Sequence, residues 1–325
     1  MKLLIKIILF GGIIIVGFLL FSFLYHNYQL RIEAEKYPPP GKLVEVNGHK
    51  MHVFTEGNGE ITLVFMAGGG TSNPTIDFKP LWMKLTDKYR IAVVEKAGYG
   101  WSETSSNSRD VDIMLEETRK ALRQSGEEGP YVLVAHSLSG LEAIYWGQKY
   151  PNEIQGIIGL DMAVPDVYLD SSFELPSSSE LNIMYLISRI GLSRFMSRKN
   201  LDKNFPLLKS DELSKEDKEK FISLFYKSSY TKNMLNEVDY IKKNAIKVKS
   251  KKVPINIPMY FFIAEDNNIN IVPSWEKNLS EYISKINSGK KKLLDCGHYM
   301  HHEKSEIIAD EIKKYIISKN PLKLE

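Results

Sequence analysis

The sequence predicts an α/β fold in which a mostly parallel β-sheet is covered by helices on both faces. Two observations support this class. Short, uniformly apolar runs alternate along the chain with longer segments whose apolar residues recur at helical spacing. Runs without polar alternation are typical of strands that are buried on both faces, as in parallel sheets. The runs also end in glycine or polar residues, and ligands bind where the strands of such sheets end.

The expected elements follow from these patterns in chain order. A hairpin over residues 42–55 turns at Asn47 and Gly48, a pair that favours the tight turn between antiparallel strands. We expect further strands at residues 61–66, 91–95, 131–134, 154–160, 259–263 and 292–294. We expect helices at residues 111–125, 141–150 and 306–318.

Composition suits a globular domain with an insertion. The chain has 325 residues, of which 43% are hydrophobic, and a domain of this size needs no metal or disulfide to stabilise its core. The single cysteine, Cys296, has no partner for an internal disulfide. The net charge is +3, and Lys2 and Lys6 supply two of these charges. We therefore expect no nucleic-acid partner.

The N-terminus predicts a membrane anchor. Residues 7–25 are apolar apart from Ser22, and about 20 such residues span a bilayer as a helix. Lys2 and Lys6 precede the run, and positive flanks stay in the cytoplasm. We expect a single-pass cell-membrane protein whose main domain is extracytoplasmic. The alternative is a cleaved signal peptide, which the absence of a small-x-small pattern at residues 22–26 disfavours.

The patterns divide the chain into an anchor, a linker, and a core that is interrupted by a helical insertion. The expected boundaries are 1–26 for the anchor, 27–41 for the linker, 42–163 and 256–325 for the core, and 164–255 for the insertion. The insertion has apolar residues at helical spacing and no strand run, and it is too long for a bare loop.

A basic run without an acid ends the insertion. It consists of Lys242, Lys243, Lys247, Lys249, Lys251 and Lys252. The simpler interpretation is a solvated surface. The more specific interpretation is that these lysines are attracted to anionic lipid head groups beside the anchor.

The stretch from Tyr131 to Gly140 carries the strongest chemical signal. An apolar strand runs into a sharp turn at Ser137, and a helix follows. In the nucleophile-elbow motif G-x-S-x-G, strained backbone angles hold the serine hydroxyl above the sheet. The positions two before and two after the serine must be small, and Ala135 and Ser139 meet that demand. We predict that Ser137 is a nucleophile; the alternative is a serine that caps a helix.

A nucleophilic serine needs a base and an acid. His298 follows the last expected strand in a loop that contains glycine, which matches the chain order serine, acid, histidine. The acid is expected after the strand that precedes the histidine, where Glu265 and Asp266 stand. We choose Asp266 over Glu265. Asp161 is a third candidate, because it follows the strand expected one position earlier.

Two backbone N–H groups must bind the oxygen of the tetrahedral intermediate. One comes from Leu138, the residue after the nucleophile. The other comes from the glycine-rich loop at residues 66–70, where the missing side chains let the backbone approach a substrate. We assign it to Gly69, with Gly68 as its neighbour.

A metal site has to be considered because His301, His302 and Glu303 lie near His298. Their spacing does not form H-E-x-x-H, and no fourth ligand pattern stands out. We expect neither a metal nor an organic cofactor.

These residues resemble the α/β-hydrolase superfamily over residues 43–320. Residues 134–140 resemble the family's nucleophile elbow, and Gly297 with His298 resembles its catalytic histidine loop. The insertion at residues 164–255 resembles the helical cap that covers the site in this family.

Some positions differ from the family pattern. Residues 98–102 resemble the turn of the D-x-x-G-x-G-x-S motif, with Glu95 where aspartate is usual. Ala67 stands where the oxyanion loop often has histidine, and Ala135 and Ser139 replace glycines. The elbow replacements conserve small size, so we expect activity to survive.

The resemblance implies a hydrolase that cleaves a small-molecule carboxylic ester or amide through an acyl-enzyme at Ser137. A serine there argues against epoxide and alkyl-halide hydrolysis, which in this fold resemble aspartate-nucleophile chemistry. A lipid-like ester suits a membrane-tethered enzyme. The alternatives are an aminopeptidase-like hydrolase of small peptides and a non-catalytic, membrane-anchored interaction protein on the same fold.

Overall fold

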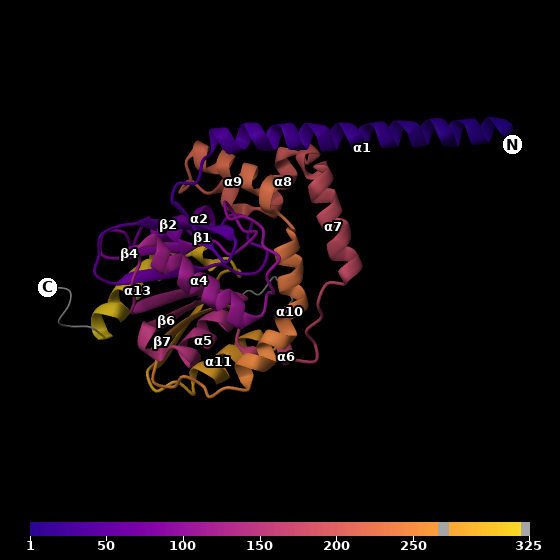
Figure 1. Ribbon diagram of the computed structural model, residues 1–325. Coiled ribbons are helices and arrows are strands. Elements are labelled where there is room, and N and C mark those ends of the chain that lie inside the picture. The colour runs from indigo at the N-terminus through magenta and orange to yellow at the C-terminus, as the bar shows by residue number, and fades with distance from the viewer. Residues whose placement is uncertain (266–272, 320–325) are drawn as a thin grey trace.

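The computed structural model describes residues 1–265 and 273–319 (Figure 1). Its centre is an eight-stranded sheet in the order β1-β2-β4-β3-β5-β6-β7-β8. The strands are β1 (Lys42–Val46), β2 (His49–Glu56), β3 (Thr62–Met66), β4 (Arg90–Val94), β5 (Tyr131–His136), β6 (Ile154–Leu160), β7 (Met259–Ala264) and β8 (Gly289–Leu294). Strand β2 pairs antiparallel with β1 and β4, and the remaining neighbours are parallel. The predicted, mostly parallel sheet is confirmed.

The predicted strands are all present. The hairpin turns at Asn47 and Gly48, whose φ angles are +51° and +85°, as a turn with two left-handed residues requires. The largest difference is β8, which begins at Gly289, three residues before the expected start. It pairs parallel with β7 as the edge strand of the sheet, and helix α11 (Trp275–Ile283) lies between the two strands in the chain.

Helices cover both faces of the sheet, as the apolar runs predict. Alternate residues of β5 point to opposite layers: Leu133 belongs to the apolar cluster with α4 (Val111–Ser125) and α5 (Ser139–Lys149), whereas Val134 belongs to the cluster with α3 (Lys79–Trp82) and α13 (Ser305–Lys319). Both strand residues are fully buried. This two-sided burial explains why the strands lack polar alternation in sequence.

The helical insertion lies between β6 and β7, over the ends of the parallel strands. It contains α6 (Pro165–Leu169), α7 (Ser178–Ile190), the 3-10 turn η2 (Leu192–Phe195), α8 (Arg198–Asn204), the turn η3 (Pro206–Lys209), α9 (Lys215–Ser228) and α10 (Lys232–Lys249). Apolar residues of the insertion, among them Leu208 and Phe221, pack on Ile76 and Trp101 of the core. We call this helical layer the cap.

The lysine run at the end of the cap makes ion pairs with acids that are distant in sequence. Lys247 lies 2.6 Å from Asp110 and 2.8 Å from Asp112, and Lys249 lies 2.6 Å from Asp166. These contacts support the interpretation as a solvated surface of the domain.

Helix α1 (Lys2–Lys36) continues beyond the apolar run, through most of the segment expected as a linker. Its N-terminal half extends beyond the body of the protein (Figure 1). Its polar C-terminal end is tied to the cap, because Arg194 makes two 2.7 Å contacts with Glu33 and the Tyr37 hydroxyl donates to Glu219 over 2.7 Å. By length and composition this helix can cross a membrane.

Candidate active site

Ser137 occupies the sharp turn between β5 and α5. Its φ angle is +53°, a left-handed conformation that costs energy in a residue with a side chain. The turn needs small neighbours, since a Cβ on Gly140 would lie 2.2 Å from the Ala163 carbonyl oxygen. Ser139 fits because its hydroxyl donates to the Met66 and His136 carbonyls over 2.7 and 2.8 Å. These bonds explain how serine replaces the usual glycine.

His298 lies beside this turn, in the loop after β8, and its ring is held by Asp161. The Nδ1 atom of His298 lies 2.7 Å from Oδ2 of Asp161, and both side chains are buried. A histidine held through Nδ1 presents Nε2 to its surroundings, which is the arrangement of a serine–histidine–aspartate triad.

Asp161 is fixed from several directions. Its second oxygen, Oδ1, accepts hydrogen bonds from the Ala264 N–H and from Trp275 Nε1, each over 3.1 Å. The residue directly follows β6, is fully buried, and has a φ angle of +44°. A carboxylate whose oxygens each have a donor is held in one orientation, and it can hold the imidazole in turn.

The sequence predicts Asp266 as the carboxylate that holds the histidine, and that residue lies outside the described part of the chain. The other candidate in that loop, Glu265, has an exposed side chain, and its backbone N–H donates to the Leu294 carbonyl over 2.9 Å. Among the described carboxylates, Asp161, the third candidate, is the one in contact with His298.

The glycine-rich loop after β3 lies against the Ser137 turn. A Cβ on Gly68 would lie 2.9 Å from Cβ of Ser137, and a Cβ on Gly69 would lie 2.9 Å from the Leu138 side chain. Side chains at these positions would push the loop away. The glycines therefore bring the backbones of Gly69 and Leu138 together at one wall of a cavity.

A hydrogen-bond chain connects this loop to the cap. The Gly70 N–H donates to the Tyr99 hydroxyl over 3.2 Å, and that hydroxyl donates to Glu237 of α10 over 2.6 Å. Glu237 also makes a buried ion pair with Lys96. Burial and the adjacent Glu237 charge raise the pKa of Tyr99 well above its usual value, so the hydroxyl stays protonated. Sequence patterns gave no indication of this chain, because Glu237 lies in the cap.

A cavity of about 1000 Å³ separates the cap from the strand ends. Ser137, Leu138, His298 and Gly69 line its floor. Most of the cap side is apolar, with Phe173, Leu175, Phe205, Phe221, Phe225, Met234, Val238 and Ile241 among its lining residues. Such a cavity has the size and polarity of a site for an organic ligand with a substantial apolar part.

Tyr168, at the start of the cap, also contacts the candidate nucleophile. Burial and the Glu237 charge raise the pKa of its hydroxyl well above the usual value, and a hydrogen bond with the Ser137 side chain offsets part of that rise. The tyrosine is therefore a neutral hydrogen-bonding group at Ser137.

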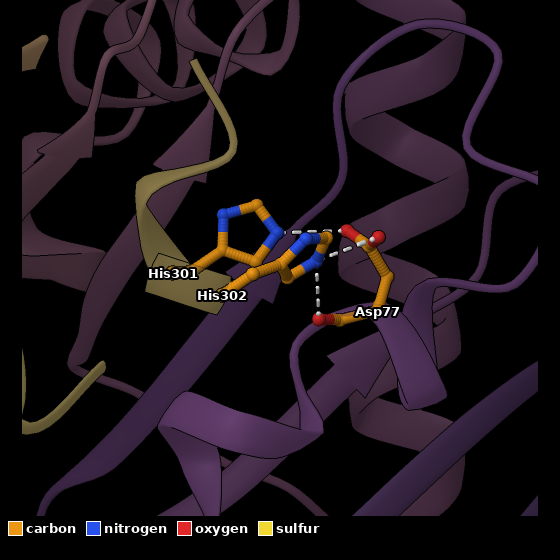
Figure 2. A group of neighbouring side chains, drawn as sticks. All are labelled: Asp77, His301 and His302. Carbon is orange, nitrogen blue, oxygen red and sulfur yellow. Dashed lines mark hydrogen bonds and ion pairs between the residues drawn. The ribbon is translucent and has the colours of Figure 1, made fainter. Parts of the chain in front are cut away.

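A second group of imidazoles lies behind His298. The Nε2 atoms of His301 and His302 lie 2.9 and 3.1 Å from the two carboxylate oxygens of Asp77, as Figure 2 shows. His136 bridges this group and the site: its Nε2–H donates to the His298 carbonyl over 3.1 Å, and its ring lies 4.7 Å from that of His301. Burial, together with the charges of the neighbouring imidazoles, holds the pKa of His136 well below its usual value.

Asp77, His301 and His302 are residue types that bind metals, and their ligand atoms lie within 4.8 Å of one another. A catalytic zinc site takes three such ligands. Here, however, both histidine Nε2 atoms already bond the carboxylate directly. These contacts form a hydrogen-bonded cluster that joins α2 (Pro74–Asp77) to α12 (Met300–Glu303).

Known proteins share sequence similarity with this chain. A Bacillus subtilis protein named YbdG is 38% identical over 239 residues, which cover 73% of this chain and 72% of that protein. The 2-(acetamidomethylene)succinate hydrolase of Mesorhizobium japonicum is 25% identical over 118 residues, covering 36% of this chain and 41% of the enzyme.

Solved structures share the fold at low sequence identity. The epoxide hydrolase VrEH1 of Vigna radiata superimposes with a TM-score of 0.60 at 19% identity, covering 85% of this chain and 97% of that one. The Cfl2 protein of Burkholderia cenocepacia gives a TM-score of 0.61 at 16% identity, covering 84% and 94%. The family model for the alpha/beta hydrolase fold matches residues 62–305. This chain belongs to the α/β-hydrolase family.

Proposed function

We propose that this protein is a membrane-anchored serine hydrolase that cleaves a carboxylic ester or amide through an acyl-enzyme at Ser137. The observation that carries the proposal is the 2.7 Å contact between His298 Nδ1 and the buried Asp161. It leaves Nε2 as the nitrogen that takes a proton, beside a serine on a strained turn. Epoxide hydrolysis is not proposed, because the turn carries serine.

The steps follow from these positions. Ser137 Oγ attacks the substrate carbonyl carbon, and its proton passes to His298 Nε2. The oxyanion accepts hydrogen bonds from the Leu138 and Gly69 N–H groups. The tetrahedral intermediate collapses as His298 gives the proton to the leaving alcohol or amine. Water then attacks the acyl-enzyme as His298 takes its proton. The acyl–Oγ bond breaks, His298 returns the proton to Ser137 Oγ, and the carboxylic acid leaves.

The acid in this proposal is Asp161 in place of Asp266. Its carboxylate stabilises the charged imidazole that forms in each half of the reaction. The two donors on its second oxygen, from Ala264 and Trp275, keep that carboxylate aimed at His298.

Anchoring by α1 is supported by contacts that the helix makes with the cap. Ser22 donates to the Ile190 carbonyl over 2.8 Å, and His26 is buried against Gly191, where a Cβ would lie 2.3 Å from the His26 Cβ. A signal sequence has similar length and composition, but its cleavage after the apolar run would remove this fitted surface. We propose that the helix remains attached and spans the membrane.

Labelling with a fluorophosphonate probe tests the chemistry. The folded wild-type protein should be labelled at Ser137, and Ser137→Ala should abolish labelling and lower turnover of an ester panel by several orders of magnitude. Wild-type protein that is folded yet unlabelled would support a non-catalytic interaction protein instead.

For the anchor, the intact N-terminus should appear in the membrane fraction, and a soluble form that starts near Asn27 would contradict the proposal.

A further inference from the structure

The outer helix of the cap, α7, exposes several apolar side chains. Ile183 and Leu186 are 58% and 55% exposed, and Met184 is also exposed. Ser188, in contrast, is buried and donates to the Ser229 carbonyl over 3.0 Å. A surface helix normally directs apolar residues inward and polar residues to solvent, and clustered exposed apolar residues indicate a contact surface.

The position of α1 indicates what covers this surface. The end of α7 is joined to α1 through Ser22 and Gly191. Figure 1 shows α7 as the outermost cap helix on the side from which the N-terminal half of α1 extends. A bilayer that surrounds residues 7–25 therefore lies directly against the outer face of α7.

The turn η2, which follows α7, shows how deeply this part of the cap would lie in the bilayer. Phe195 of η2 is 49% exposed, and its ring lies 5.4 Å from Phe18 and 6.5 Å from Tyr25 of the apolar run. Seven residues separate Phe18 from Tyr25, which corresponds to about 10 Å along a helix. Because its ring lies near both residues, Phe195 sits between their levels, less than about 10 Å inside the end of the apolar run, at a depth typical of interfacial helices.

The same segment forms a wall of the cavity above Ser137. Leu181 of α7, with Leu175 and Pro176 before it, lines the cavity together with Ser137 and His298. One side of this short segment thus faces the cavity, and the other side faces the region that the bilayer occupies.

We infer that α7 and η2 form an interfacial lid that rests in the lipid bilayer, and that substrates reach Ser137 from the membrane. The substrate class is an acyl ester of a membrane lipid, whose chain enters the apolar cap side of the cavity while the ester carbonyl reaches Ser137. This inference rests on the proposed function, and it adds the source and class of the substrate.

The test compares two esters in the full-length protein reconstituted into phosphatidylcholine vesicles. One is a water-soluble short-chain ester and the other is a long-chain acyl ester held in the bilayer. Ile183→Asp and Leu186→Asp should lower turnover of the bilayer ester about tenfold or more, while turnover of the soluble ester and fluorophosphonate labelling stay within twofold. Ile307→Asp is the matched control, because Ile307 is an exposed residue of α13, which lies on the other side of the domain from α7 (Figure 1).

The outcomes separate the inference from the proposed function. Unchanged turnover of the bilayer ester, or an equal loss with both esters, would overturn the lid inference while Ser137 chemistry stands. A wild-type protein that cleaves neither ester and is not labelled would overturn the proposed function itself. A dimer in detergent that Leu186→Asp converts to monomer would show that a second copy covers α7.

A second measurement reports contact with lipid independently of turnover. A fluorophore attached to Leu186→Cys should be quenched by nitroxide groups on lipid acyl chains, and one attached to Ile307→Cys should not. The native Cys296 is buried and is spared by the labelling reagent. Equal quenching at both positions, or none at Leu186→Cys, would contradict the inference.

Discussion

Two buried histidines near the end of the chain, His298 and His301, are each held by an aspartate, but through different ring nitrogens. His298 uses Nδ1 to contact Asp161 over 2.7 Å, whereas His301 uses Nε2 to contact Asp77 over 2.9 Å. His298 therefore presents Nε2 at the cavity. The remaining nitrogen of His301, Nδ1, is buried without a hydrogen-bond partner in the described structure.

The difference shows that the role of a histidine–aspartate pair depends on which imidazole nitrogen remains free to take a proton, and on where that nitrogen lies. A general base must bring a nitrogen within hydrogen-bond reach of the proton that it removes. His298 lines the same cavity as Ser137, and its Nδ1 contact with Asp161 leaves Nε2 for this task. His301 lies behind it, and its contact with Asp77 joins two short helices. We therefore expect the first pair to control turnover and the second to control stability.

The largest expected effect comes from Asp161→Asn. Losing the carboxylate changes the preferred tautomer of His298 and removes the charge that stabilises its protonated form, so turnover should fall about 10³- to 10⁴-fold. Steady-state kinetics on any cleaved ester would measure this loss. Asp266→Asn is the control and should stay near wild type. The reverse result would identify Asp266 as the acid.

Asp77→Asn is the matched change in the second pair. It removes one partner of a buried charged cluster, so the free energy of unfolding should fall by about 3 kcal/mol or more. Turnover of the protein that remains folded should change less than tenfold. Urea unfolding in detergent and active-site titration with a fluorophosphonate separate the two quantities. A 10³-fold loss of turnover would place Asp77 in the catalytic machinery.

Stability should depend on pH through His301. Burial lowers its pKa from 6.5 to about 4, despite the neighbouring Asp77. The unfolded chain therefore binds a proton between pH 6.5 and 4 that the folded chain does not, and stability decreases as the pH falls through this window. The expected loss from this residue is roughly 3 kcal/mol. Burial raises the pKa of Asp77, but the two imidazoles outweigh burial and hold that pKa well below its usual value, so its own contribution is lost only at lower pH.

His301→Gln tests that assignment, because a glutamine amide can replace the Nε2–H donor to Asp77 without titrating. The free energy of unfolding, measured from pH 7 to pH 4.5, should fall less steeply in this variant than in the wild type. Part of the slope should persist, since the pKa of the buried His136 is also lowered. An unchanged slope would mean that His301 is already protonated in the folded protein.

A smaller effect is expected from Tyr99→Phe, which removes a group that holds the site without touching the substrate. The Tyr99 hydroxyl accepts from the Gly70 N–H and donates to Glu237. Without it the loop that carries Gly69 is held less precisely, and kcat should fall about tenfold, less than the 10²- to 10³-fold cost of losing an oxyanion donor.

The control for that variant is Tyr131→Phe, because the Tyr131 hydroxyl donates to the Glu127 carbonyl at the other end of β5. A purely structural role for Tyr99 would lower the melting temperature in both variants without a selective change in kcat. An effect of Tyr99→Phe on KM alone would indicate that the tyrosine contacts the substrate.

The strands, the Ser137 turn and the His298 loop were predictable because each has a local signal. An apolar run that ends in small residues is visible in a single sequence, and β6 was predicted with the bounds it has in the structure. The acid was not predictable in this way. Asp161 and Asp266 both follow apolar runs, and the contacts that distinguish Asp161, from Ala264 and Trp275, come from residues more than 100 positions away.

The cluster around Asp77 and the orientation of α7 show the same limit. Asp77 meets His301 across 224 residues, and nothing in the local sequence of either marks the contact. The exposed apolar face of α7 has the spacing of an ordinary core helix, so its sequence predicts a helix but not the side that is buried. The burial of Ser188 in the folded protein shows which side of α7 faces the domain.

Removal of divalent cations is expected to have no effect, and this separates a structural role for the second pair from a metal-binding one. In residues 1–265 and 273–319, Asp77, His301 and His302 are the one group of three or more histidine, cysteine or acidic side chains placed closely enough to hold an ion. An ion there would have to displace hydrogen bonds of 2.9 and 3.1 Å between both Nε2 atoms and the carboxylate. Turnover and melting temperature should therefore be the same before and after dialysis against EDTA. A loss of both that zinc restores in the wild type, but not in His302→Gln, would show instead that this cluster binds a metal.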